Sequence, residues 1–142
     1  MKILIVIADF YTDIAEMQLS GATEALDAQN IDYDTVTVPG ALEIPPAIAY
    51  AAQSGQYEGY VALGCVIRGE TTHYDTVCND SSRGIMELGI QHFLPVGNGI
   101  LTVENRQQAI VRADKTQKNK GGGAVEACLR LVELQARWIT AE

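Results

Sequence analysis

The feature that most constrains the fold is a fourfold alternation of short apolar runs with longer segments of helical spacing. The first run, residues 2–8 (KILIVIA), is nearly continuous and β-branched, as expected of a strand buried on both faces of a sheet. Similar runs follow at residues 32–38, 57–63 and 96–103, and the polar alternation of 32–38 indicates a strand nearer the sheet edge. Strands that alternate with helices form a parallel sheet covered on both faces. The sequence therefore predicts an α/β fold of three layers with a four-stranded parallel sheet.

Helix signals fill the segments between these runs. Asp13 can cap the first helix, and Pro45-Pro46 marks the start of the second, because proline is tolerated in a first helical turn. The predicted helices span residues 13–28, 45–54, 72–92, 105–114 and 122–139. No repeat or low-complexity linker interrupts the 142 residues, so we expect one domain over residues 1–142.

Charge and composition exclude several functional classes. Ten basic and eighteen acidic residues give a net charge of −8 without a basic stripe, which argues against nucleic-acid binding. No signal sequence or membrane span is expected, and three cysteines without a CxxC pair favour the reducing cytoplasm. Since the overall field repels anions, an anionic substrate has to be held by local cations such as Arg68, Arg112 and Lys120.

The third strand runs into a glycine-flanked loop that begins at residue 64 and leads to a helix. Ligands of open α/β sheets bind at the carboxyl ends of strands, so this loop is a candidate site. Glu70, Thr71 and Thr72 could present backbone N–H groups to an anion at the helix start, although plain capping by a threonine explains them equally well. Imidazole suits proton transfer at neutral pH, which makes His73 a candidate acid–base; the alternative is a structural histidine.

Further candidates follow the other strands. Glu43 comes after Gly40-Ala41, where small residues allow a planar ligand to approach the backbone. Phe10 follows the first strand and is either a stacking surface for a heteroaromatic ring or a core aromatic. Arg112 and Lys120 could reach a phosphate from a neighbouring loop or subunit, unless residues 118–123 are simply a capped surface loop. Neither a P-loop nor a GxGxxG fingerprint occurs.

Four strings of residues carry a resemblance to a known family. They are residues 38–45 (VPGALEIP), 64–74 (GCVIRGETTHY), 99–105 (GILTVEN) and 119–121 (NKG). In this order, and over essentially the whole chain, they resemble the lumazine synthase family of riboflavin biosynthesis.

The resemblance implies a flavodoxin-like α/β/α subunit that forms a homopentamer with active sites between adjacent subunits. It implies a transferase that condenses 5-amino-6-(D-ribitylamino)uracil with 3,4-dihydroxy-2-butanone 4-phosphate. The products would be 6,7-dimethyl-8-ribityllumazine, phosphate and water, formed without a metal or organic cofactor. The expected partners are these small molecules and further copies of the chain, not nucleic acid or membrane.

The resemblance also implies roles for individual residues. His73 would transfer protons, and Phe10 would stack on the pyrimidine. The loop backbone at Glu70 and Thr71 would bind the butanone phosphate, together with Arg112 of a neighbouring subunit. The residues expected to bind substrate are Phe10, Gly40, Ala41, Leu42, Glu43, Cys65, Val66, Ile67, Glu70, Thr71, Asn98, Arg112 and Lys120. Arg68 is interpreted as a structural ion-pair partner that holds the loop.

The chain departs from the family pattern at Asp9 and Tyr11, where many members have Arg and Asn, and at Asn98. Many members have Phe at the position of Asn98, and the positive charge lost at Asp9 could weaken substrate binding. Because of Asp9, a second interpretation remains: the chain is a weak or inactive family member that binds a flavin or lumazine, or that serves as an assembly scaffold. It also suggests a receiver-type signalling domain, but that class needs an acid where Gly64-Cys65 stand. Because no N-terminal extension precedes the first strand, we expect a free pentamer or a pair of pentamers rather than a larger shell.

Overall fold

The sheet is parallel and four-stranded, as predicted. The computed structural model describes residues 1–139, so the last residues of the predicted domain, 140–142, lie outside the described part. The strands are β1 (Lys2–Ala8), β2 (Asp32–Val38), β3 (Gly59–Ile67) and β4 (Val96–Val103). Their order is β2-β1-β3-β4, which places β2 at an edge and is the order of a flavodoxin-like doubly wound fold.

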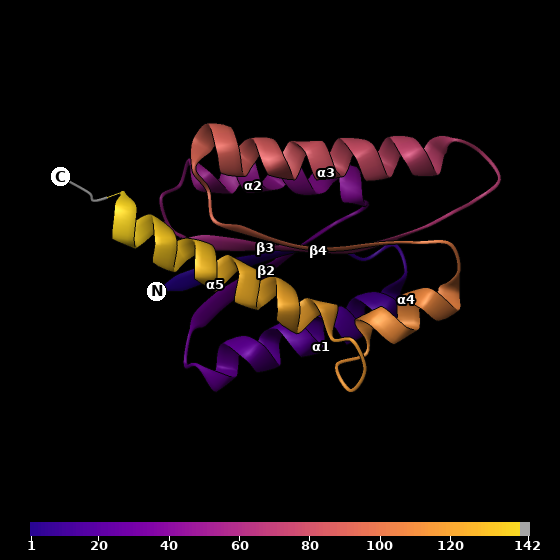
Figure 1. Cartoon of the computed structure of the whole chain (residues 1–142), viewed down its shortest axis with the longest axis horizontal. Helices are drawn as coiled ribbons and strands as arrows, with labels where there is room; N and C mark the ends of the chain where they lie inside the picture. Colours follow the sequence, from indigo (N-terminus) through magenta and orange to yellow (C-terminus); the bar gives the residue numbers. More distant parts are fainter. Residues whose placement is uncertain (140–142) are drawn as a thin grey trace.

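Helices cover both faces of this sheet and complete the three predicted layers (Figure 1). One face is covered by α1 (Thr12–Ala28), α4 (Arg106–Ala113) and α5 (Lys120–Trp138). The other is covered by α2 (Ile44–Ala52), which follows the short 3-10 turn η1 (Ala41–Glu43), and by α3 (His73–His92). Within residues 1–139, no helix is both long and apolar enough to cross a membrane.

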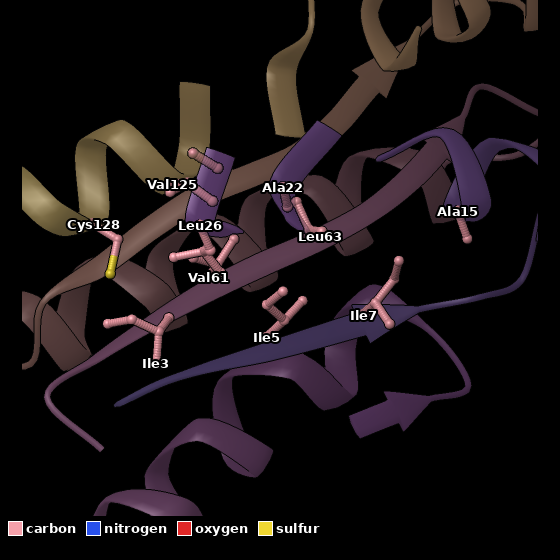
Figure 2. Close-up of a cluster of buried hydrophobic side chains, with 11 residues drawn as sticks. Ile3, Ile5, Ile7, Ala15, Ala22, Leu26, Val61, Leu63, Val125 and Cys128 are labelled. Atoms are coloured by element: carbon pink, nitrogen blue, oxygen red, sulfur yellow. The ribbon is translucent and has the colours of Figure 1, made fainter. Parts of the chain in front are cut away.

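The central strand β1 supplies side chains to the hydrophobic core on both faces. Figure 2 shows its odd-numbered residues, Ile3 to Ile7, packed beside Leu26 of α1 and Val125 of α5. The intervening side chains pack toward α2 and α3 on the opposite face: Leu4, Val6 and Ala8. Burial on both faces explains why this strand reads as a continuous apolar run rather than as an alternating one.

The predicted end of the third strand was wrong. Gly64 to Ile67 continue β3 instead of forming a loop, because β4 pairs with the strand as far as Ile67 opposite Val103. The predicted start of this strand, residue 57, was also wrong, because β3 begins at Gly59. The strand therefore projects beyond the end of its pairing with β1, which stops at Ile7 opposite Leu63, and remains paired with β4 alone.

Two helix starts also differ from the prediction. Asp13 is not the cap of α1: Tyr11 takes that position without a side-chain hydrogen bond, and the carboxylate of Asp13 pairs with Arg106 of α4 instead. Helix α5 begins at Lys120, because Asn119 adopts a left-handed conformation and its Oδ1 accepts a hydrogen bond from the backbone N–H of Gly122 (3.2 Å). The glycines at 121–123 thus form the first helical turn rather than a loop.

A pair of glycine substitutions tests the contact between α5 and α1. Gly121→Ala is expected to lower the free energy of unfolding by about 1–3 kcal/mol, because the new Cβ would overlap the carbonyl oxygen of Gln18 in α1. In Gly123→Ala the new Cβ meets nothing within 4 Å, and alanine favours the helix by about 1 kcal/mol. Urea denaturation followed by circular dichroism compares them; equal stability would contradict the close contact.

Candidate active site

A cleft of about 450 Å³ opens at the carboxyl ends of the strands. Its walls come from the turn after β1, from η1, from the projecting end of β3 and from the first turn of α3. Most of the predicted site residues line it: Phe10, Gly40, Leu42, Glu43, Cys65, Val66, Ile67, Thr71 and His73. Segments from four parts of the sequence thus meet at the end of the sheet where ligands of such folds bind.

Two predicted residues lie beside the cleft without lining it. Ala41 is buried within η1, and Glu70 is exposed on the loop between β3 and α3. Sequence reasoning missed four lining residues: Tyr11, Gly69, Tyr74 and Val77. Val77 lies one helical turn after His73, a spacing that could have indicated it.

Phe10 is an exposed aromatic surface rather than a core residue. Its side chain is 74% exposed, so the core interpretation was wrong. The ring meets Tyr11 edge to face, with centroids 4.9 Å apart and planes at 84°. An accessible ring at a cleft wall can stack on a planar heterocycle.

His73 is the first residue of α3 and is exposed at the cleft wall. The preceding residue, Thr72, makes no side-chain cap, so of the two threonines expected to cap this helix only Thr71 can do so. Thr71 does contribute locally, since its Oγ1 accepts a hydrogen bond from the backbone N–H of His73 (3.3 Å). The N–H groups of a first helical turn lack partners inside the helix, and an anion can satisfy those left free.

Cys65 forms part of the wall as a neutral thiol. Burial raises the pKa of this thiol to about 11. Because the thiolate is the nucleophilic form, this raised pKa disfavours covalent chemistry at Cys65, and we assign the residue to the shape of the wall.

Arg68 is held in ion pairs, as predicted, and does not line the cleft. Its Nε lies 2.6 Å from Oε2 of Glu104, and its Nη1 lies 3.7 Å from Oδ1 of Asp75. Its guanidinium also stacks over the ring of Tyr74, 4.3 Å from the ring centroid. The charge of Arg68 is therefore engaged by the loop and its neighbours.

The other predicted cations lie in a different cavity, of about 410 Å³, along β4. Asn98, Arg112 and Lys120 line it, contributed by β4, α4 and α5. Neither cation pairs with a carboxylate within residues 1–139, and Arg112 donates from Nη1 to the backbone carbonyl of Gln108 (3.1 Å). No Lys or Arg of the described chain lines the first cleft. The predicted site residues that line a cavity are thus divided between two cavities.

Comparison with known proteins identifies the family. The model of the family described as 6,7-dimethyl-8-ribityllumazine synthase matches residues 1–136. The chain belongs to this family. A lumazine synthase of Sphingopyxis alaskensis is 55% identical, covering 96% of this chain and 96% of its own length. One from Bartonella tribocorum is 56% identical (96% and 91% covered), and a 6,7-dimethyl-8-ribityllumazine synthase 1 from Rhizobium meliloti is also 56% identical (96% and 93%).

Two of the departures from the lumazine synthase pattern have different surroundings. Asp9 is exposed at the end of β1, where its backbone N–H donates to the carbonyl of Val38 (3.3 Å), and it does not line the cleft. Asn98 lines the cavity along β4, and its Oδ1 accepts from the backbone N–H of Ile100 (3.0 Å). Asp9 therefore lies outside the cleft wall, whereas Asn98 lines the second cavity.

Proposed function

We propose that the chain condenses 5-amino-6-(D-ribitylamino)uracil with 3,4-dihydroxy-2-butanone 4-phosphate. The products are 6,7-dimethyl-8-ribityllumazine, inorganic phosphate and water, so the protein is a transferase of riboflavin biosynthesis. The observation that carries the proposal is the lining of one cleft by an exposed Phe10 ring and by His73 at the start of α3. Relatives that share more than half of its residues carry the name of this activity.

In this proposal the pyrimidine stacks on Phe10 and lies between the η1 turn and the projecting end of β3. The butanone phosphate binds the loop backbone at Glu70 and Thr71, beside the first turn of α3. The 5-amino group attacks the ketone and water leaves to give an imine; phosphate is then eliminated, and ring closure releases a second water. His73 accepts and returns the protons. Holding both reactants in one cleft supplies much of the rate.

A second copy of the chain completes this site. A phosphate in the cleft needs cations, and Arg112 and Lys120 lie in the other cavity with their charges unpaired within residues 1–139. An apolar groove lined by Ile90, Phe93 and Trp138 adjoins that cavity at Asn98, and these three large side chains are exposed. We propose that both surfaces lie at the contact with a neighbouring subunit of a homopentamer. Asn98 would then face the pyrimidine of the neighbour's site.

Light scattering tests the assembly. A pentamer is expected at about five times the 15.3 kDa of one chain, and a pair of pentamers at twice that mass. Larger shells would scatter far more strongly. A monomeric mass at full activity would contradict a site shared between copies.

Absorbance of the lumazine product tests the reaction. Mixing the two substrates with the folded protein is expected to give product at a rate proportional to protein concentration. Binding of the lumazine without turnover would overturn the enzymatic proposal in favour of a binding protein. We place the reaction in the cytoplasm, where the three cysteines, which are free thiols here, stay reduced.

A further inference from the structure

The ion pair between Arg68 and Glu104 joins two segments that carry different parts of the proposed site. Arg68 opens the loop of residues 68–72 between β3 and α3, and Glu104 follows β4 directly. Their side chains are 42% and 57% exposed, a setting in which a single ion pair contributes little. Arg68 makes more contacts than one pair, however. It also reaches Asp75 in the first turn of α3 and stacks over Tyr74.

The backbone beneath this ion pair is fixed as well. The N–H of Arg68 donates to the carbonyl of Val103 (3.0 Å), so the pairing of β3 with β4 continues into the loop. The N–H of Glu104 donates to Oε1 of Gln108 (2.8 Å), while Oδ1 of Asn105 accepts from the N–H of Gln108 (2.9 Å). This reciprocal arrangement resembles a capping box at the start of α4. Glu104 is therefore held by a structured helix start, and it can in turn hold Arg68.

We infer that Glu104 is a positioning residue: it fixes Arg68, and through Arg68 the 68–72 loop and the first turn of α3. The inference rests on the proposed function, in which that loop binds the phosphate and the same turn carries His73. Asp75 alone cannot take this role, because it belongs to the turn that has to be positioned. Glu104 lies across the loop on a separate element, so its carboxylate provides an external anchor.

The same junction orients Arg112. The carbonyl of Gln108 accepts from Nη1 of Arg112, and the side chain of this glutamine accepts from the N–H of Glu104. Glu104 therefore contacts Arg68 through its carboxylate and Gln108 through its backbone N–H, and the carbonyl of Gln108 contacts the cation of the second cavity. Both groups proposed to bind phosphate are aligned by the residues that start α4.

Two substitutions distinguish a positioning role of Glu104 from the effect of its negative charge on phosphate binding. Glu104→Gln removes a negative charge near the proposed anion site, so electrostatics alone would tighten phosphate binding. Loss of the anchor instead predicts weaker binding, about three- to tenfold in the Kd for inorganic phosphate. Arg68→Lys keeps the charge but loses the planar fork and its stacking on Tyr74, and we expect the same direction of change.

The chain offers a matched control. Glu24 pairs with Lys115 at 2.6 Å on the α1 surface, with side chains 65% and 40% exposed. Glu24→Gln therefore removes an equivalent exposed ion pair away from the cleft. The test is hydrogen exchange of the 69–75 amides by mass spectrometry, without and with inorganic phosphate, for all three variants and the unaltered protein.

The outcomes distinguish this inference from the proposed function. Faster exchange of these amides in Glu104→Gln and Arg68→Lys, with Glu24→Gln unchanged, is the expected result. Unchanged exchange in Glu104→Gln, or phosphate binding at least as tight as in the unaltered protein, would overturn the positioning role. If phosphate fails to slow exchange in the unaltered protein, the proposed phosphate site is wrong. The exchange rates of the variants, measured without phosphate, then still decide whether Glu104 anchors the loop.

Discussion

His73→Ala is expected to lower kcat about 100- to 1,000-fold while leaving the affinity for inorganic phosphate nearly unchanged. The imidazole stands at the cleft wall on the first residue of α3, where it can reach a bound substrate. The phosphate is proposed to bind backbone N–H groups of the loop and the cations, none of which the substitution removes. Steady-state kinetics, with phosphate as a competitive inhibitor, measures both quantities.

The other histidine is the control. His92 is exposed at the far end of the same helix, so His92→Ala should retain the turnover and the pH profile of the unaltered protein. An unchanged rate in His73→Ala would remove this residue from the mechanism.

Arg112→Ala is expected to raise the KM for the phosphorylated butanone about 10- to 100-fold, as loss of a charge-assisted hydrogen bond to phosphate does. The KM for the pyrimidine should change little. Arg106→Ala, on the same helix but paired with Asp13 of α1, is the matched control and should leave both values near their original level. A change confined to the pyrimidine KM would show that the phosphate assignment is wrong.

Mixed assemblies show whether the two residues belong to different copies. His73→Ala and Arg112→Ala subunits are each impaired alone. When they are refolded together at random, roughly one interface in four should combine the intact histidine of one copy with the intact arginine of its neighbour. Recovered activity is the expected result. If no activity returns in a mixed assembly, both residues act within one chain.

The strands could be predicted closely from the sequence because burial dictates their composition. β1, β2 and β4 begin and end where the apolar or alternating runs do. The end of β3 could not be read this way, since Gly64 resembles a strand terminator and only pairing with β4 keeps the chain extended to Ile67. Asp13 failed as a cap for a similar reason: a tertiary contact with Arg106 takes its carboxylate.

Part of the candidate site could also be predicted from the sequence. Phe10, Glu43 and His73 follow different strands, and parallel strands bring their carboxyl ends to one edge, so a shared cleft was foreseeable. The separation of Arg112 from His73 was not deducible from spacing, because it depends on α4 packing on the opposite face of the sheet from α3. The family resemblance supplied that expectation instead.

If the site is shared between copies, as proposed, the division of charge between two cavities makes catalysis depend on how the copies associate. Each copy carries one cleft and one pair of cations, so a head-to-tail row of copies with free ends would leave one cleft and one cation pair unused. In a closed ring every cleft lies beside the cations of a neighbouring copy. The turnover rate per chain would therefore depend on ring closure. On dilution this rate should fall as the rings open, while each subunit is still folded.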